Sequence, residues 1–236
     1  MRLTGTRITR WAAALLAPAL LLATAACSGD DAGGGGDSPQ DVLASAKKSL
    51  DDTSGVKLSL KTDKLPQGVD GVVEAAGTGT HAPAFDGSIK VVVNNLNVDV
   101  PVVAVQGAVY AKLPFTTTFA EIDPADYGAP DPADLMDPEN GISGWLTAAE
   151  DVEEGDQTRD GDQVLTTYNA TLPGSAVSGV IPSADKKADF DATFEIDDEG
   201  RLVTADVKGP FYGSKGDVDY AITLSSYGTD KDIKAP

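Results

Sequence analysis

The feature that most limits how this chain can fold is an alternation of apolar and polar residues with a period of two. The segment 190–196, for example, reads Phe-Asp-Ala-Thr-Phe-Glu-Ile. Successive side chains of a strand point to opposite faces, so the pattern predicts strands with one buried face and one wet face, as in antiparallel sheets. The same pattern, or a short apolar run between turn residues, predicts further strands over residues 56–61, 88–93, 96–100, 102–105, 109–113, 164–172, 202–208 and 218–224.

Helix signals lie before and between these strands. Ser38 can cap a helix that has Pro39 in its first turn and ends near Asp52. Residues 119–154 interrupt the strands with three Asp-Pro pairs, each typical of a cap followed by the first helical residue. A further short helix is expected over residues 175–180. The order of elements predicts a single α+β domain that has one large antiparallel sheet and a helical insertion.

The N-terminus has the pattern of an export signal. Arginines at positions 2, 7 and 10 are its only charges, and the apolar run Trp11–Ala26 follows them. The run is shorter than the roughly 18–20 residues that span a bilayer. It ends in small residues directly before Cys27, the one cysteine of the chain, which predicts a lipobox. Thr24 departs from this pattern, because leucine is usual there.

We therefore expect residues 1–26 to be a signal peptide that is removed and Cys27 to carry acyl groups. Residues 27–38 are rich in Gly, Ser and Asp and predict a flexible tether. Residues 39–236 form the folded body. The acyl chains would anchor the protein in the cytoplasmic membrane, on its extracytoplasmic face.

Charge and composition exclude several classes of function. The chain has a formal net charge of −19, which repels nucleic acid. Its one histidine, His81, lies in a loop-like Gly-Thr-Gly-Thr-His segment, and no Gly-x-Ser-x-Gly elbow is present, so a serine hydrolase is not expected. The acidic residues Asp131, Asp134, Asp137 and Glu139 lack the spacing of a calcium loop and are better explained as helix caps. No enzyme activity, metal or cofactor is predicted.

Several stretches resemble the LppX/LprA/LprF/LprG family of mycobacterial lipoproteins, which carry lipids across the cell envelope. The most specific are Gly107-Ala-Val-Tyr-Ala-Lys-Leu113 and Asp131-Pro-Ala-Asp-Leu-Met-Asp-Pro-Glu-Asn-Gly141, which precedes Trp145. Ser175–Val180 and Leu224-Ser-Ser-Tyr-Gly228 add to the resemblance, which covers the body from about Pro39 onward. None of these stretches is a catalytic signature.

The resemblance implies a curved antiparallel sheet, a half-barrel, with helices over its concave face that enclose an apolar cavity for acyl chains. The cargo it implies is an acylated lipid such as a glycolipid, a phospholipid or a triacylglycerol. Some relatives act with a membrane exporter, although no residue of this chain identifies such a partner. The residues expected to line the cavity are Val91, Val93, Val98, Val100, Val109 and Ala111 from strands, and Leu135, Trp145, Leu146, Val177 and Val180 from helices.

A second interpretation stays open at this point. The chain has few aromatic residues, 6% of the total, which fits either an open cavity or a thinly filled core. Trp145 suits a plain core position as well as a cavity wall. A surface lipoprotein with a filled core, which binds a protein or the cell wall and transports no lipid, would share the anchor, the tether and the fold.

Overall fold

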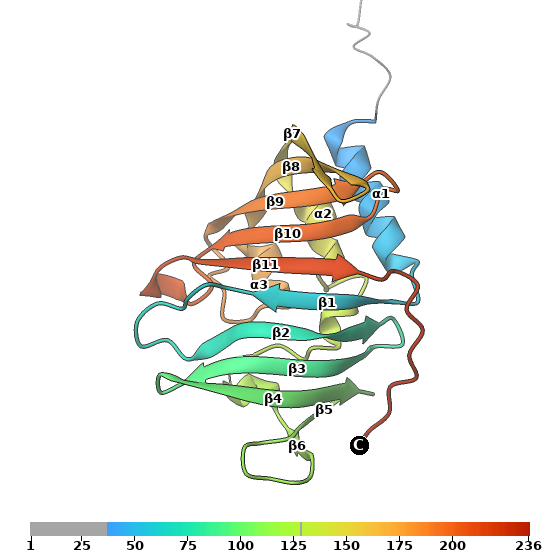
Figure 1. Ribbon diagram of the computed structural model, residues 1–236. Coiled ribbons are helices and arrows are strands. Elements are labelled where there is room, and N and C mark those ends of the chain that lie inside the picture. Colours follow the sequence, from blue (N-terminus) through green and yellow to red (C-terminus); the bar gives the residue numbers. More distant parts are fainter. Residues whose placement is uncertain (1–36, 128) are drawn as a thin grey trace, which may run out of the picture. The chain divides into compact units, whose positions relative to one another are not determined.

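The alternating segments pair into one antiparallel sheet of eleven strands, in the order β6-β5-β4-β3-β2-β1-β11-β10-β9-β8-β7 (Figure 1). The computed structural model describes residues 37–127 and 129–236. The predicted signal peptide, Cys27 and nearly all of the predicted tether lie outside these residues. Every neighbouring pair of strands is antiparallel, and the two outermost strands, β6 and β7, do not meet. The sheet is therefore open, as a half-barrel requires.

The elements follow one another along the chain with short connections. The helices are α1 (Pro39–Asp51), η1 (Pro124–Tyr127), η2 (Asp134–Met136), α2 (Ser143–Ala148), α3 (Gly174–Val180) and η3 (Gly213–Lys215), where η marks a 3-10 helix. The strands are β1 (Gly55–Lys61), β2 (Gly71–Thr80), β3 (Ala84–Val93), β4 (Leu96–Val105), β5 (Ala108–Ala111), β6 (Ala120–Ile122), β7 (Glu150–Asp160), β8 (Gln163–Pro173), β9 (Asp189–Asp197), β10 (Leu202–Gly209) and β11 (Val218–Ser225).

Helix α1 begins where the sequence predicts. The Ser38 hydroxyl oxygen accepts a hydrogen bond from the backbone N–H of Asp41 at 3.3 Å, and Pro39 occupies the first turn. Leu43, Ala46 and Leu50 recur with helical spacing and are fully buried. The apolar face of α1 thus packs onto the sheet, and its polar face stays in water.

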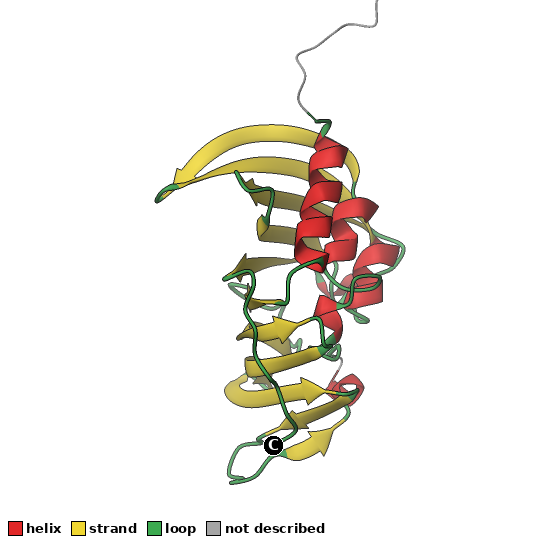
Figure 2. Cartoon of the chain, turned by 90° about the vertical axis from the view of Figure 1, so that its right-hand side faces the viewer, coloured by secondary structure: helices red, strands yellow, loops and turns green. Residues whose placement is uncertain are grey.

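The three α-helices cover only one half of one face of the sheet. Figure 2 shows the sheet bending around them. The main core joins side chains of α1, α2 and α3 to the inner faces of β7–β11 and β1. Phe190, Phe211 and Tyr220 form edge-to-face aromatic contacts there, with ring centroids 4.9–5.0 Å apart. We call the face that carries the helices the inner face and the opposite one the outer face.

The Asp-Pro pairs form less helix than predicted. Asp123 accepts a hydrogen bond from the N–H of Ala125 and starts the 3-10 helix η1. Asp131 and Asp137 instead hold turns: Asp131 bonds the N–H of Ala133, and Asp137 those of Glu139 and Asn140. A carboxylate that accepts the backbone N–H of the second residue after it stabilises an Asx turn as readily as a helix cap. After Asp131 and Asp137, the next α-helix begins only at Ser143.

Within the described residues, no helix combines the length and the apolar character needed to cross a bilayer.

Candidate functional site

The register of the sheet brings most of the predicted strand residues onto one face. Val91 pairs with Val98 across β3 and β4. On the same face Val100 pairs with Ile89, and Val109 and Ala111 of β5 pair with Ala104 and Val102. Because side chains alternate along each strand, these residues form a continuous apolar surface across β3, β4 and β5. Val93, two residues beyond Val91, ends this row beside the β3–β4 turn, where it pairs with Leu96.

This surface belongs to the inner face of the sheet. Phe85, Val102, Ala104, Val109 and Ala111 pack together with Ala133, which lies just before η2. On the neighbouring strand β2, Gly79 pairs with Phe85, and a Cβ atom on Gly79 would lie 2.7 Å from Cγ of Met136, so Gly79 also faces η2. The connection between β6 and α2 therefore crosses the inner face of β2–β5, where the α-helices do not reach.

Part of the inner surface remains half-buried. Val91, Val98, Val100 and Ile89 are neither fully exposed nor fully covered. In the other half of the sheet, the inner-face residues Phe190, Phe194, Ile196 and Leu202 are at most 2% exposed. The inner face is thus closed over β8–β11 by the helices and left partly open over β3 and β4.

The predicted helix residues lie in the closed half. Trp145, Leu146, Val177 and Val180 belong to the main core, and Leu135 packs against its edge. Trp145 is 1% exposed, and its indole N–H donates a hydrogen bond to the carbonyl of Ala176 at 3.3 Å. The strand residues Val109 and Ala111 belong to a separate cluster. The structure therefore brings the helix residues together and the strand residues together, but it does not place the two groups in one cluster.

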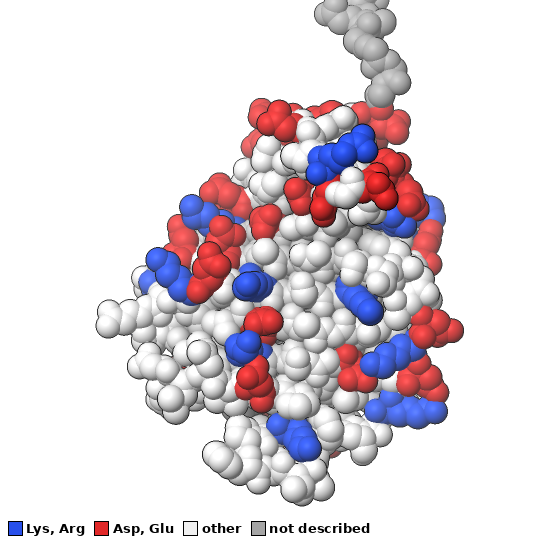
Figure 3. Space-filling view, viewed as in Figure 1, with Lys and Arg blue, Asp and Glu red and all other residues white. Residues whose placement is uncertain are grey.

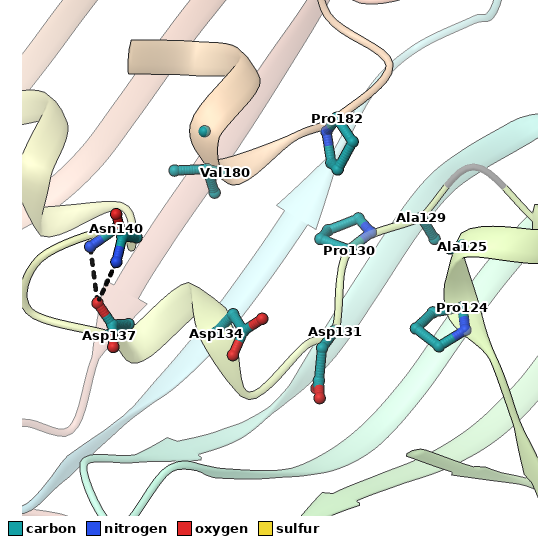
Figure 4. Close-up of a pocket in the computed structure, with 11 residues that line it drawn as sticks. Pro124, Ala125, Ala129, Pro130, Asp131, Asp134, Asp137, Asn140, Val180 and Pro182 are labelled. Carbon is teal, nitrogen blue, oxygen red and sulfur yellow. Dashed lines mark hydrogen bonds between the residues drawn. The ribbon is translucent and has the colours of Figure 1, made fainter. Parts of the chain in front are cut away.

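A pocket of about 340 Å³ lies between the 124–140 segment and the end of α3 (Figure 4). Val180 and Pro182 form one side, and Pro124, Ala129 and Pro130 form much of the other. The remaining lining residues are Ala125, Asp131, Asp134, Asp137, Asn140 and Gly179. Val180 is the only one of the predicted cavity residues that lines this pocket.

The carboxylates of the pocket are not arranged as a metal site. Asp131 and Asp137 are held by the turn hydrogen bonds described above. Partial burial, together with the negative charges of Asp131 and Asp137, raises the pKa of Asp134 above its usual value. Among the described residues, no group of three or more His, Cys, Asp and Glu side chains is placed to hold a metal ion.

His81 lies against the end of α1 rather than free on the surface. Its Nε2 atom is 2.7 Å from the carbonyl oxygen of Leu50, in the last turn of the helix, and the residue is half-buried. The expectation of a loop position is confirmed, because His81 sits in the β2–β3 turn. A hydrogen bond to an orphan helix carbonyl is a structural role.

Comparison with known protein families gives one decisive match. The model of the LppX_LprAFG lipoprotein family matches residues 38–234, which is nearly all of the described chain. The chain belongs to the LppX_LprAFG lipoprotein family. The resemblance read from the sequence is thereby confirmed. No curated protein sequence gives a significant match.

Two solved structures share the fold of this chain. LprF from Mycobacterium bovis is 15% identical, with a TM-score of 0.67 over 86% of this chain and 99% of LprF. LppX from Mycobacterium tuberculosis is 16% identical, with a TM-score of 0.60 over 83% of this chain and 98% of LppX. The predicted architecture, an open antiparallel sheet with helices on one face, is confirmed by these LppX_LprAFG folds and by the structure itself.

Several inner-face residues of this LppX_LprAFG chain are absent from the residues predicted from the sequence, among them Val102 and Ala104 of β4 and Ile89 and Phe85 of β3. Ile89 and Phe85 lie on the same face as Val91, as their even spacing along β3 requires. Once Val91 is assigned to the inner face, that spacing alone identifies Ile89. Phe85 required the structure, because no pattern of residues indicates that β3 begins as early as Ala84.

Proposed function

We propose that this protein binds an acylated lipid against the inner face of β3–β5 and carries it across the cell envelope. The cargo is a glycolipid, a phospholipid or a triacylglycerol, and no catalytic step is involved. Acyl groups on Cys27 would hold the protein on the extracytoplasmic face of the cytoplasmic membrane. A membrane exporter that delivers or accepts the cargo would fit this role.

One observation supports the proposal above all others: the same apolar inner face is sealed in one half of the sheet and half-open in the other. Residues such as Phe194 in the helix-covered half are fully buried, whereas Val91, Val98 and Val100 keep part of their surface accessible. Apolar surface that water can reach costs about 25 cal/mol per Å², and acyl chains that cover it recover that free energy. Membership of a lipoprotein family fits the same interpretation.

The proposal gives the predicted residues separate roles. Val91, Val93, Val98, Val100, Val109 and Ala111 would contact acyl chains. Leu135 and Val180, at the margin of the main core, would border the lipid, whereas Trp145, Leu146 and Val177 would support that border from within the core.

The first experiment is native mass spectrometry of residues 28–236, produced without the signal peptide and Cys27, followed by extraction and analysis of bound lipid. We expect a lipid with two or three acyl chains at near-stoichiometric amount. Val91→Trp should remove it, because the indole fills the inner surface. Val92→Trp is the matched control, since the neighbouring valine points to the outer face and should leave the lipid bound.

Two results would count against the proposal. If the protein is free of lipid and takes up no offered glycolipid, phospholipid or triacylglycerol, the lipid-carrier function is wrong. The alternative would then be a lipoprotein that binds a protein or the cell wall. If Val91→Trp and Val92→Trp lose lipid equally, the lipid lies somewhere other than the inner face.

A further inference from the structure

The described residues leave three large apolar side chains exposed, and all three lie in the part of the sheet that holds β3–β6. They are Val93 at 39%, Leu96 at 68% and Phe115, whose side chain is fully exposed. Val93 and Leu96 flank the β3–β4 turn and pair with each other. Phe115 lies in the loop that joins β5 to β6. We call these three residues the apolar corner.

Strand direction points the β5–β6 loop toward the end of β4 that carries the β3–β4 turn, and the loop starts level with Pro101, whose carbonyl accepts the N–H of Lys112. β4 starts at Leu96, and antiparallel β5 runs back toward that end, since Ala108 pairs with Val105 and Ala111 with Val102. The loop after Ala111 therefore leaves the sheet on the side of Leu96. Figure 1 shows this loop at the extremity of the sheet, beyond β4 and far from the β7 edge.

The Phe115 side chain is held outward by a constrained turn. The N–H of Thr116 donates to the carbonyl of Leu113 at 3.1 Å, and the Thr116 hydroxyl donates to the same oxygen at 2.7 Å. Pro114 and Phe115 occupy the two central positions, and Phe115 has a φ of +66°. Glycine or asparagine is the usual residue at a position of this kind, because a side chain strains the backbone there. A fully exposed phenylalanine in this place is unfavourable for folding and therefore points to a use in binding.

Charge is sparse around the apolar corner although the chain is strongly acidic. Residues 100–120 contain a single charged side chain, that of Lys112. Three nearby acids are engaged: Glu74 and Asp99 both lie within 4 Å of Lys90 Nζ, and Asp70, just before β2, accepts the N–H of Asn94. Glu121 of β6 adds one exposed negative charge beside the loop. Figure 3, which views the outer face, shows few charged side chains at the end of the molecule that holds β4–β6.

We propose that the apolar corner docks the protein onto the surface of a lipid bilayer. Aromatic and aliphatic side chains on an uncharged loop tip partition into the headgroup region, whereas a patch for an acidic or basic protein partner would carry charge. The row Val91–Val98 continues directly into Val93–Leu96, so docking brings the half-open inner face to the membrane. This last link, with cargo entering or leaving at the corner, rests on the proposed function; the docking itself does not.

The test is co-flotation of residues 28–236 with phosphatidylcholine vesicles. The unanchored protein is required because acyl groups on Cys27 would bind vesicles by themselves. The wild type is expected to float with the vesicles. Phe115→Gly and Leu96→Ser should each weaken partitioning by about tenfold, the expected effect of withdrawing one large apolar side chain from a lipid phase. Vesicles containing 30% phosphatidylglycerol should bind less protein, because the acidic body is repelled by them.

Asn95→Gly is the matched control. Asn95 also has a positive φ, of +63°, and lies in the same corner, so glycine relieves the backbone there without removing an apolar side chain. It should float like the wild type. Phe115→Gly should be at least as stable as the wild type, since glycine suits its φ, so lost flotation would not reflect unfolding.

Each outcome decides one question. A wild type that stays unbound, or a Phe115→Gly variant that floats as well as Asn95→Gly, overturns the docking surface. Native mass spectrometry of the same samples reports the cargo independently. Bound lipid without flotation would overturn only the docking surface, and flotation without bound lipid would overturn only the lipid-carrier function.

Discussion

At the scale of single residues, Gly77 shows how tightly β2 and β3 are fitted together on the inner face. A Cβ atom on Gly77 would lie 2.5 Å from Cζ of Phe85 and 2.7 Å from the carbonyl oxygen of Asp86. Because both distances are well below van der Waals contact, Gly77→Ala must displace the ring or the strand. We expect it to lower the free energy of unfolding by about 1–3 kcal/mol, measured by thermal or denaturant unfolding.

Gly179→Ala is the control for this prediction. Gly179 lies in α3, and its Cβ would have no atom within 4 Å. Alanine there should therefore leave stability unchanged or raise it by up to about 1 kcal/mol. If both variants lose the same stability, the loss at Gly77 does not come from the contact with Phe85.

The β9–β10 turn depends on one buried carboxylate. The Asp197 side chain is 2% exposed and accepts hydrogen bonds from the N–H groups of Glu199 and Arg201, at 3.0 and 2.9 Å, and from Arg201 Nε at 2.8 Å. Asp197→Ala leaves these donors unpaired and should cost about 1–3 kcal/mol in urea unfolding. Asp198→Ala, on the exposed neighbour, should change stability by no more than about 0.5 kcal/mol. Equal losses would show that the turn does not need the Asp197 carboxylate.

At the scale of elements, the C-terminal segment that carries Lys231 and Ile233 packs on the outer face of β3 and β4, and we call it the strap. Ile233 packs against Ala84, Val103 and Val105, and Lys231 Nζ lies 2.8 Å from Asp86 Oδ2. Burial of the isoleucine outweighs the ion pair, because both charged side chains are about 40% exposed and surface pairs contribute little. We expect Ile233→Ala to cost about 1–2 kcal/mol and Lys231→Ala less than about 0.5 kcal/mol, measured by thermal unfolding. The reverse order would mean that the strap is held electrostatically.

A strand could be predicted from the sequence when one of its faces is buried and the other is exposed to water. β9 and β11 have one buried and one wet face, so their alternation identifies them. β7 was not predicted, because as an edge strand rich in acidic residues it buries only Val152. Exposed acids on an edge strand also discourage pairing with another chain. β2 was missed as well, since its Gly, Ala and Thr residues give no apolar periodicity.

For the candidate site, the sequence predicts which strand residues share a face, but it does not predict where the helix residues lie. Pairing around the Asn94-Asn95 turn fixes which valines of β3 and β4 share a face, and the sequence placed that turn correctly. The sequence could not show that Trp145 and Val177 would pack into the other half of the sheet. That placement depends on which strands the helices cover, a long-range property that local periodicity does not contain.

At the scale of the whole molecule, the two halves of the sheet should differ in dynamics. Helices cover the inner face of β8–β10, whereas a connection with little helix covers β3–β5. Local opening is easier where fewer apolar contacts hold the strands, so the amides of β3–β5 should exchange hydrogen faster than those of β8–β10. Hydrogen exchange read by mass spectrometry, on protein stripped of lipid, measures this difference directly.

Lipid should then act on one half only. If acyl chains bind the inner face of β3–β5, their addition slows exchange in those strands, because binding stabilises the closed state by mass action. Exchange in β8–β10 should change little, since that core is already complete. Val91→Trp should abolish the slowing, and Val92→Trp should preserve it. Uniform protection of both halves would place the lipid elsewhere or show that the sheet opens as one unit. Unchanged exchange in β3–β5 at saturating lipid would contradict a lipid site on that face.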